Sequence, residues 1–233
     1  GIAAKHGYEW CIPPSDRKGI ENYSLHECFK LSSERKEDVI ETQYAQEPYF
    51  HFCQELFDKC PDNVDLFGYY QSPKYFNHIE DEIRKDFSFS KELTDSCEDV
   101  INNLGDDAIS LHIRRTDYKA NPNHPLQPIE YYTSALDKLP KGSPVIVFSD
   151  DPQWCEDNEV FSDDRFAISN NAADFDLCLM GLCKYHIIAN SSYSWWGAWL
   201  GKSDKVIAPK NWFGASCSHK SVDDMVFGDW SWL

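Results

Sequence analysis

Ionisable and hydroxyl-bearing side chains gather where four apolar segments of the sequence end. They are Arg114, Arg115 and Asp117 after segment 108–113, Asp150 and Asp151 after segment 144–149, Ser169 at the end of segment 165–169, and Asn190, Ser191 and Ser192 at the end of segment 186–190. Arginine suits phosphate oxygens because it presents a planar fork of donors and its charge does not titrate away. Serine hydroxyls beside the free N–H groups of a helix start also bind anions. Together these residue types indicate a site for a phosphorylated ligand such as a diphosphate leaving group.

The first of these segments, "AISLHI", has the pattern of a strand whose two faces differ. Alternation places the isoleucines and leucine at 109, 111 and 113 on one face and Ser110, His112 and Arg114 on the other. His112 and Arg114 are therefore expected to point the same way. The alternative interpretation of the charged end is an ordinary ion pair between an arginine and Asp117.

The fourth segment continues as "HIIANSSYSWWGAWL" and changes from strand to helix near Tyr193. Ser191 and Ser192 then lie at the helix start, where their hydroxyls and the free amides converge on one point. Ordinary N-capping by a serine is the alternative. Trp195 and Trp199 have the i, i+4 spacing of one helix face, and we expect them to pack in the core.

The second segment ends in two acids, Asp150 and Asp151. A carboxylate accepts hydrogen bonds from ribose hydroxyls or from purine N–H groups, and guanine offers two such donors. Capping of the helix that begins at "PQW" is the competing role. We expect one acid to contact a ligand and the other to cap the helix, and the sequence leaves open which does which.

Five apolar segments alternate with helical ones in the second half of the chain. They are 108–113, 144–149, 165–169, 186–190 and 205–209. Such alternation predicts an α/β fold with a doubly wound parallel sheet and right-handed crossovers, so we expect a Rossmann-like domain over 106–233. Ligands bind such a sheet beyond the carboxyl ends of its strands. Residues 1–105 are less regular and predict a smaller α/β domain, with the hinge in the Asn-, Gly- and Asp-rich stretch 102–108.

Charge and composition limit the partners of this chain. It carries 39 acidic against 22 basic side chains, a formal net charge of −17, which argues against general affinity for nucleic acid or anionic membranes. No segment approaches the ~20 apolar residues of a membrane span, and the sequence does not begin with a signal-peptide pattern, so we expect a soluble cytoplasmic protein. The nine cysteines lack a C-x-x-C pair and predict reduced, mostly buried thiols.

Three of the segments described above resemble a known family in their order and spacing. "HIRRTDY", "FSDD" and "NSSYSWWGAWL" are similar to the three peptide motifs of the α1,2-fucosyltransferases, glycosyltransferase family 11. The first motif also resembles that of α1,6- and protein O-fucosyltransferases. The resemblance extends through "IAPKNWF" and back into "GYYQSPKYF" and "EIRKDF", so it covers most of residues 65–213.

The resemblance implies a GT-B fold and an inverting transfer of L-fucose from GDP-β-L-fucose to a galactose 2-hydroxyl, with no cofactor and no metal. GDP-fucose and a galactose-terminated glycan are the implied partners. The donor site implied by the resemblance contains His112, Arg114, Arg115, Asp150, Asp151, Ser169, Asn190, Ser191 and Ser192. Within it the family's phosphate-contacting arginine falls on Arg114, its phosphate-binding serines on Ser191 and Ser192, and its guanine-contacting acid on Asp150 or Asp151.

The family's N-terminal pattern differs from that of this sequence. Relatives usually begin with a G-G-x-G-N-Q turn that contributes to the donor and acceptor cleft, and this sequence starts after it. We therefore expect an acceptor-side domain over 1–105 that lacks its first strand and this turn.

The expected mechanism is a single in-line displacement through an oxocarbenium-like state. Arg114, His112 and Asp117 are the expected catalytic residues, with Arg114 stabilising the charge on the departing phosphate. Asp117 either takes the proton of the acceptor hydroxyl or orients Arg115, and Glu130 is a second candidate for the base. The alternatives are a GDP-fucose-dependent transferase with another acceptor linkage and a non-catalytic GDP-sugar-binding protein.

Other polar residues are assigned structural roles. Asp174 and Asp176 form a D-x-D pattern that holds metal-bound nucleotide sugars in another class of transferases, but acids also favour helix starts, and nothing nearby completes an oxygen cage. We expect a helix start there and no metal site. His124 and His186 have no partners at ligand spacing and receive no functional role.

Overall fold

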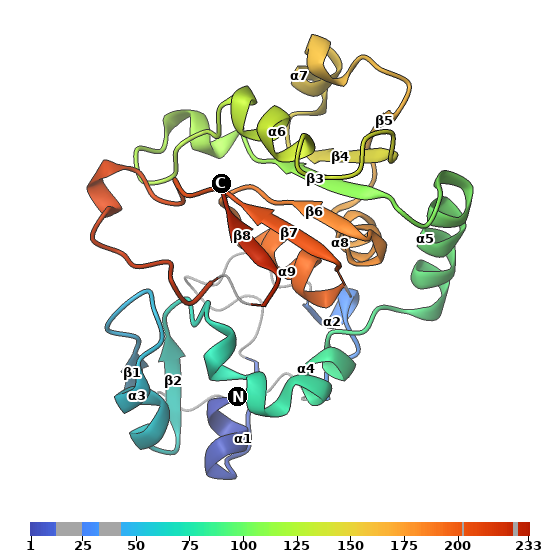
Figure 1. Cartoon of the computed structure of the whole chain (residues 1–233). Helices are drawn as coiled ribbons and strands as arrows, with labels where there is room; N and C mark the ends of the chain where they lie inside the picture. Colours follow the sequence, from blue (N-terminus) through green and yellow to red (C-terminus); the bar gives the residue numbers. More distant parts are fainter. Residues whose placement is uncertain (13–24, 33–42, 202, 226–227) are drawn as a thin grey trace. The chain divides into compact units, whose positions relative to one another are not determined.

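The computed structural model describes residues 1–12, 25–32, 43–201, 203–225 and 228–233. The chain divides into two compact units, one formed by 1–90 with 220–225 and the other by 91–219 with 226–233 (Figure 1). The division falls at residue 90 rather than at the expected 105. Helix α5 (Lys91–Leu104) belongs to the second unit because it packs on α8 (Ala173–Leu182), where the thiol of Cys97 lies 3.6 Å from the carbonyl oxygen of Phe175.

The second unit contains a six-stranded parallel sheet in the order β5-β4-β3-β6-β7-β8. The strands are β3 (Ile109–Ile113), β4 (Val145–Ser149), β5 (Phe166–Ile168), β6 (Tyr185–Ile187), β7 (Lys205–Ala208) and β8 (Trp230–Trp232). Chain order runs outward from β3 to β5 and then outward from β6 to β8, so it reverses between β3 and β6. This is the strand order of dinucleotide-binding Rossmann folds, and it confirms the expected fold class. Five of the strands were expected, and β8 was not.

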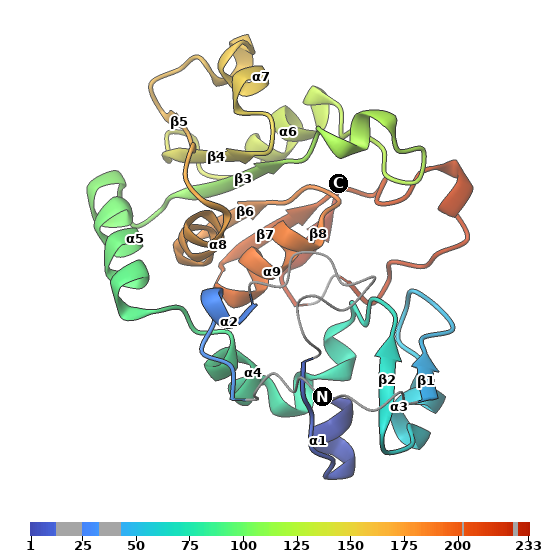
Figure 2. The ribbon, with the colours of Figure 1, turned by 180° about the vertical axis from the view of Figure 1, so that it is seen from behind.

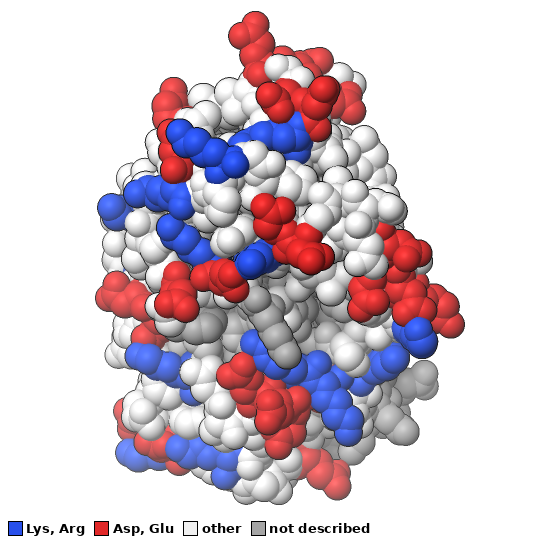
Figure 3. Space-filling view, turned by 45° about the vertical axis from the view of Figure 1, so that its right-hand side comes forward, with Lys and Arg blue, Asp and Glu red and all other residues white. Residues whose placement is uncertain are grey.

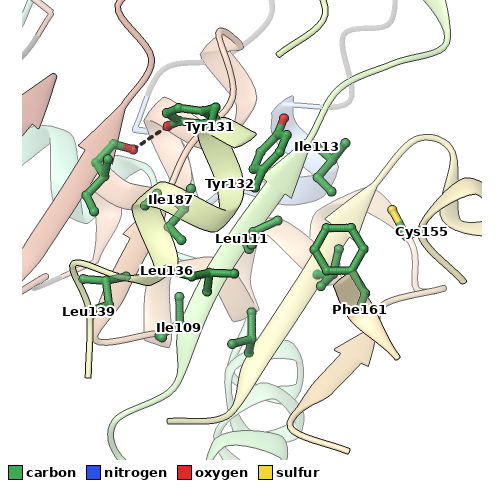
Figure 4. Packing of buried hydrophobic residues seen from close by; sticks show 14 residues of the cluster. Ile109, Leu111, Ile113, Tyr131, Tyr132, Leu136, Leu139, Cys155, Phe161 and Ile187 are labelled. Carbon is green, nitrogen blue, oxygen red and sulfur yellow. Dashed lines mark hydrogen bonds between the residues drawn. The ribbon is translucent and has the colours of Figure 1, made fainter. Parts of the chain in front are cut away.

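One face of this sheet is covered by α6 (Ile129–Leu136). Ile109, Leu111 and Ile113 of β3 lie in one buried cluster with Tyr132 and Leu136 of that helix (Figure 4). Each such side chain contributes about 1.5–3 kcal/mol when it is fully removed from water. The expected alternation is therefore confirmed, and all five residues of β3 are buried because helices cover both faces of the sheet.

The opposite face is covered by α8 and α9 (Ser192–Leu200), which pack against each other (Figure 2). Trp195 and Trp199 are buried, and the Trp195 ring lies 5.7 Å from that of Trp230 on β8. Asp174 and Asp176 lie in the first turn of α8. Both expectations, tryptophans in the core and acids at a helix start, are confirmed.

The first unit is built of short elements. They are α1 (Ile2–His6), α2 (Leu25–Cys28), β1 (Gln43–Gln46), α3 (Gln54–Lys59), β2 (Val64–Phe67), the 3₁₀ turns Pro73–Tyr75 and Asn77–Ile79, and α4 (Glu80–Asp86). β1 and β2 pair in parallel, so this unit contains both helices and a small sheet, as expected for an α/β domain. The charged segment "LSSERKEDVIE" at 31–41, whose pattern predicts a helix, lies almost entirely outside the described residues.

The state of the cysteines, the length of the helices and the surface charge concern the protein as a whole. All nine cysteines are free thiols, and five of them are buried. None of the described helices is long and apolar enough to cross a membrane. Basic and acidic side chains are interspersed on the face shown in Figure 3.

Candidate functional site

The polar ends of β3 and β6 meet where the strand order reverses. β3 and β6 are hydrogen-bonded neighbours, and both end at the same edge of the sheet. The hydroxyl of Tyr118, in the loop after β3, donates a 2.8 Å hydrogen bond to the carbonyl of Asn190, after β6. The His112 ring of β3 lies 5.5 Å from the Tyr193 ring of α9. The residues expected to share a site at the carboxyl ends of these two strands are therefore in contact through their loops.

Asp150 shapes the turn that follows β3. Its carboxylate accepts the N–H of Arg115 at 2.8 Å and that of Thr116 at 2.9 Å, together with the Thr116 hydroxyl. Burial alone would raise the pKa of Asp150, but these hydrogen bonds and the Arg114 charge outweigh it and lower the pKa below 3.8. The stabilisation is thus present at neutral pH and is lost as the pH falls through this lowered pKa.

Arg114 lies between two carboxylates. Its Nε donates to Asp117 at 2.8 Å and lies 3.4 Å from Asp150, and its side chain is 35% exposed. Neither terminal amino group forms a hydrogen bond with any described residue. A guanidinium held through Nε leaves its two terminal amino groups for an external anion.

The expectation that Asp117 orients Arg115 is wrong, because its partner is Arg114. Arg115 is held instead by Asp151, with Nε 3.2 Å from the carboxylate, and its guanidinium stacks 3.8 Å over the Trp154 ring. Asp151 also accepts a 2.8 Å hydrogen bond from Lys119. Arg115 is therefore a fixed part of the loop.

The expectation that one of the two acids caps the "PQW" helix is also wrong. Asp151 occupies the N-cap position of α7 (Pro152–Glu156), but its side chain makes no capping hydrogen bond. The ion pairs with Arg115 and Lys119 compete for that carboxylate. Asp150 lies one residue earlier and is occupied by the turn after β3.

His112 is buried, with 3% of its surface exposed. Burial, with a smaller contribution from the Arg114 charge, lowers the pKa of His112 to about 3. The ring is therefore neutral at physiological pH, so it offers hydrogen bonds but no charge. Its Nδ1 has no partner among the described residues.

The start of α9 leaves its hydroxyls available. Ser191 is the N-cap residue, yet its side chain makes no capping hydrogen bond. Ser192 begins the helix and is exposed. The first-turn N–H groups of a helix have no partner within the helix, so they and both hydroxyls remain for a ligand. The alternative of side-chain N-capping is wrong for Ser191.

Two other expected donor-site residues are engaged within the protein. Asn190 is buried and donates from Nδ2 to the carbonyls of Pro125 and Trp212, at 3.1 and 3.0 Å. Ser169 follows β5, two strands from β3, and its hydroxyl donates to Asp176 at 2.5 Å. Burial raises the pKa of Asp176, which the Ser169 hydrogen bond opposes.

The residues outside this group are less suited to the chemistry. Glu130 is exposed at the start of α6, and its side chain forms no hydrogen bond or ion pair with the described residues of the loop after β3. His124 stacks on Tyr118 with ring centres 5.0 Å apart, and buried His186 faces the Cys183 carbonyl. The described residues contain no group of three or more His, Cys, Asp or Glu side chains that could hold a metal ion.

Sequence reasoning missed three residues of this network. Thr116 contributes a hydroxyl to Asp150, Lys119 pairs with Asp151, and Trp154 lies under Arg115. Thr116 lies between Arg115 and Asp117, and Lys119 lies two residues after Asp117, so the polarity of both was an available signal. The stacking on Trp154 depends on the fold and had none.

Residues 20–233 match the model of one protein family, described as Glycosyl transferase family 11. The chain belongs to this family. Its membership confirms the resemblance carried by the three motifs at the strand ends.

The chain is similar to curated glycosyltransferases, two of which are named for an α-1,2 linkage. The α-1,2-colitosyltransferase of Escherichia coli is 33% identical over 237 residues, which cover 85% of this chain and 81% of that protein. The O-antigen biosynthesis glycosyltransferase WbnK of Escherichia coli is 32% identical over 209 residues, covering 80% and 68%. Human galactoside α-(1,2)-fucosyltransferase 1 is 24% identical over 172 residues, 66% of this chain and 47% of that protein.

Among solved structures, POFUT1 in complex with GDP aligns with a TM-score of 0.45 and 14% identity. The alignment covers 62% of this chain, which spans about half (53%) of that structure.

Proposed function

We propose that this family 11 chain is an inverting galactoside α1,2-fucosyltransferase, which moves L-fucose from GDP-β-L-fucose to the 2-hydroxyl of a terminal galactose without a metal ion. The observation that carries the proposal is Arg114, held through Nε with both terminal amino groups available, after a strand whose neighbour β6 leads into the start of α9, where the serine hydroxyls are available. Membership of the family and its α-1,2-transferring relatives supply the reaction class.

The proposed chemistry is one in-line displacement. Negative charge builds on the leaving phosphate as the bond to the sugar breaks, and donors already in place stabilise it without reorganisation. Arg114 supplies a charged fork, and the start of α9 supplies amides with the hydroxyls of Ser191 and Ser192. The neutral His112 offers a further hydrogen bond from its unpartnered Nδ1.

Asp117 is the proposed general base, because it is the acid of the first motif and its side chain is 53% exposed. We expect Asp117→Asn to lose transfer and retain GDP affinity, since the amide oxygen still accepts from Arg114 but takes no proton. Titration calorimetry with GDP and initial rates measure the two properties. Loss of both transfer and GDP affinity in a folded variant would contradict the assignment of Asp117 as the base. It would favour a role of Asp117 in positioning Arg114.

A second candidate function follows from the colitosyltransferase relative. Colitose is fucose without one hydroxyl, so a donor site for one sugar has the shape for the other. Both candidates share the nucleotide site, the inversion and the α1,2 linkage.

The experiment incubates the purified chain and lactose with GDP-fucose or its colitose counterpart, with and without EDTA, and detects products by mass. The proposal expects a fucosylated product that EDTA does not abolish. Transfer of colitose alone would favour the second candidate, and no transfer from either donor to any galactoside would contradict both.

A further inference from the structure

One hydrogen bond joins the two elements that bind the diphosphate in the proposed function. The hydroxyl of Tyr118 donates to the backbone carbonyl of Asn190 at 2.8 Å. Tyr118 lies four residues after Arg114, in the 3₁₀ turn Asp117–Ala120, and Asn190 directly precedes Ser191 at the start of α9. The bond therefore ties the loop that carries Arg114 to the helix start that carries the serines.

The Asn190 end of this bond is fixed in place. Asn190 is 2% exposed, and its Nδ2 donates to the carbonyl oxygens of Pro125, in the loop after β3, and Trp212, in the segment after β7. The hydroxyl of Tyr131 on α6 donates at 2.7 Å to the carbonyl of Ile188, two residues earlier. The Asn190 carbonyl thus belongs to a packed segment, and a group bonded to it takes a fixed position.

The Tyr118 ring is in contact with the arginine and with a second aromatic ring. The guanidinium carbon of Arg114 lies 5.9 Å from the ring centre, and the His124 ring stacks on it at 5.0 Å. Burial raises the pKa of the Tyr118 hydroxyl to about 12. The hydroxyl therefore stays protonated at neutral pH and remains a donor to Asn190.

The carboxylates that hold Arg114 do not fix its position relative to α9. Asp117 belongs to the same loop as Arg114, and Asp150 follows β4, so neither lies on β6 or on α9. A ligand that spans two groups of donors binds tightly only if their separation is set before it arrives, since binding must otherwise order the loop. A direct link between the loop and α9 removes that cost.

We propose that Tyr118 is a positioning residue of the phosphate site. Its hydrogen bond to Asn190 sets the separation between the Arg114 guanidinium and the start of α9, so that one nucleoside diphosphate reaches both. Tyr118 acts through Arg114 and does not itself bind the ligand. The identity of the nucleotide rests on the proposed function.

The test replaces Tyr118 by phenylalanine, which keeps the ring and removes the hydroxyl alone. Titration calorimetry in EDTA measures the affinities of GDP and guanosine for this variant and the wild type. We expect the ratio of the GDP affinity to the guanosine affinity to fall about fivefold, the effect of one lost hydrogen bond. The guanosine affinity is expected to stay within about twofold, because guanosine carries no phosphate for Arg114 to bind.

Tyr131→Phe is the matched control. It also removes a hydroxyl that donates to backbone carbonyls, those of Ile188 at 2.7 Å and Ile207 at 3.0 Å, and it lies in the same unit. A role in stability alone predicts that both variants lower the thermal midpoint, by about 2–4 °C, and leave the affinity ratio unchanged. The positioning role predicts that Tyr118→Phe lowers the ratio and that Tyr131→Phe does not.

A double-mutant cycle with Arg114→Ala tests whether Tyr118 acts through Arg114. If it does, adding Tyr118→Phe to Arg114→Ala changes the affinity ratio by less than about twofold, because no guanidinium is left to position. A further fivefold fall in the double variant would overturn the assignment of Tyr118 as a positioning residue for Arg114.

The outcomes separate this inference from the proposed function. If the wild type prefers GDP to guanosine by about tenfold or more and Tyr118→Phe keeps that preference, the inference alone fails. If Tyr118→Phe lowers the ratio in a chain that transfers no fucose, the inference holds and the proposed function fails. Equal wild-type affinities for GDP and guanosine would overturn both.

Discussion

Replacing Arg114 by alanine is expected to lower kcat for fucose transfer by about 10² to 10³, with the fold intact. The guanidinium is anchored through Nε to Asp117 and lies beside Asp150, so its terminal amino groups are already in place for the leaving phosphate. Arg114→Lys keeps the charge but loses the planar pair of terminal amino groups, so its kcat is expected to lie between those of the wild type and Arg114→Ala. Initial rates at saturating GDP-fucose and lactose, with thermal unfolding alongside, measure the effect.

Arg165→Ala is the matched control for this prediction. Arg165 belongs to the same unit, where its guanidinium lies 4.8 Å from the Phe166 ring, and its side chain forms no hydrogen bond or ion pair with the described residues of the loop after β3. Its variant is expected to keep at least half of the wild-type rate. Near-normal turnover by a folded Arg114→Ala chain would remove Arg114 from the mechanism.

Replacing Asp150 by alanine is expected to have the second largest effect, because three donors of one turn lose their acceptor at once. Each loss costs about 1 kcal/mol at a partly exposed site, so we expect a lower thermal midpoint and at least a tenfold loss of kcat/KM. Thr116→Val removes one of the three hydrogen bonds, so it is expected to lower the thermal midpoint and kcat/KM less than Asp150→Ala does. Thermal unfolding and initial rates measure both variants.

A nucleotide comparison separates this turn-forming role from a contact with guanine. Inosine diphosphate lacks the 2-amino donor of GDP, so a carboxylate that reads guanine discriminates between the two. If Asp150 acts through the turn, Asp150→Asn weakens the binding of GDP and of inosine diphosphate and leaves the ratio of the two affinities unchanged. A ratio that collapses toward one would assign the guanine contact to Asp150.

Much of the second unit was predictable because its strands are encoded locally. The segments around Ile109 and Val145 are short apolar runs bounded by turn residues, and both became central strands. The position of the site followed from them, because parallel strands deliver their last residues to one edge. β8 (Trp230–Trp232) was missed because a polar serine separates its two tryptophans and no apolar run forms, whereas the equally short β5 and β6 lie within longer apolar segments.

Pairings across the site were not predictable, since they depend on which strand ends become neighbours. Asp150 is 35 residues from Arg115 in sequence, and Asp117 had two adjacent arginines as candidate partners. The sequence identified the charged residues correctly but could not decide that Asp117 holds Arg114 while Asp151 holds Arg115.

The central claim is that Arg114 and the start of α9 bind the diphosphate of a guanine nucleotide without a metal. Titration calorimetry of the wild type and Arg114→Ala with GDP and guanosine, in EDTA, tests it most directly. The account predicts that GDP binds the wild type at least tenfold more tightly than guanosine does, and that Arg114→Ala removes most of this difference. Equal affinity for GDP and guanosine, or a difference that Arg114→Ala leaves intact, would contradict it.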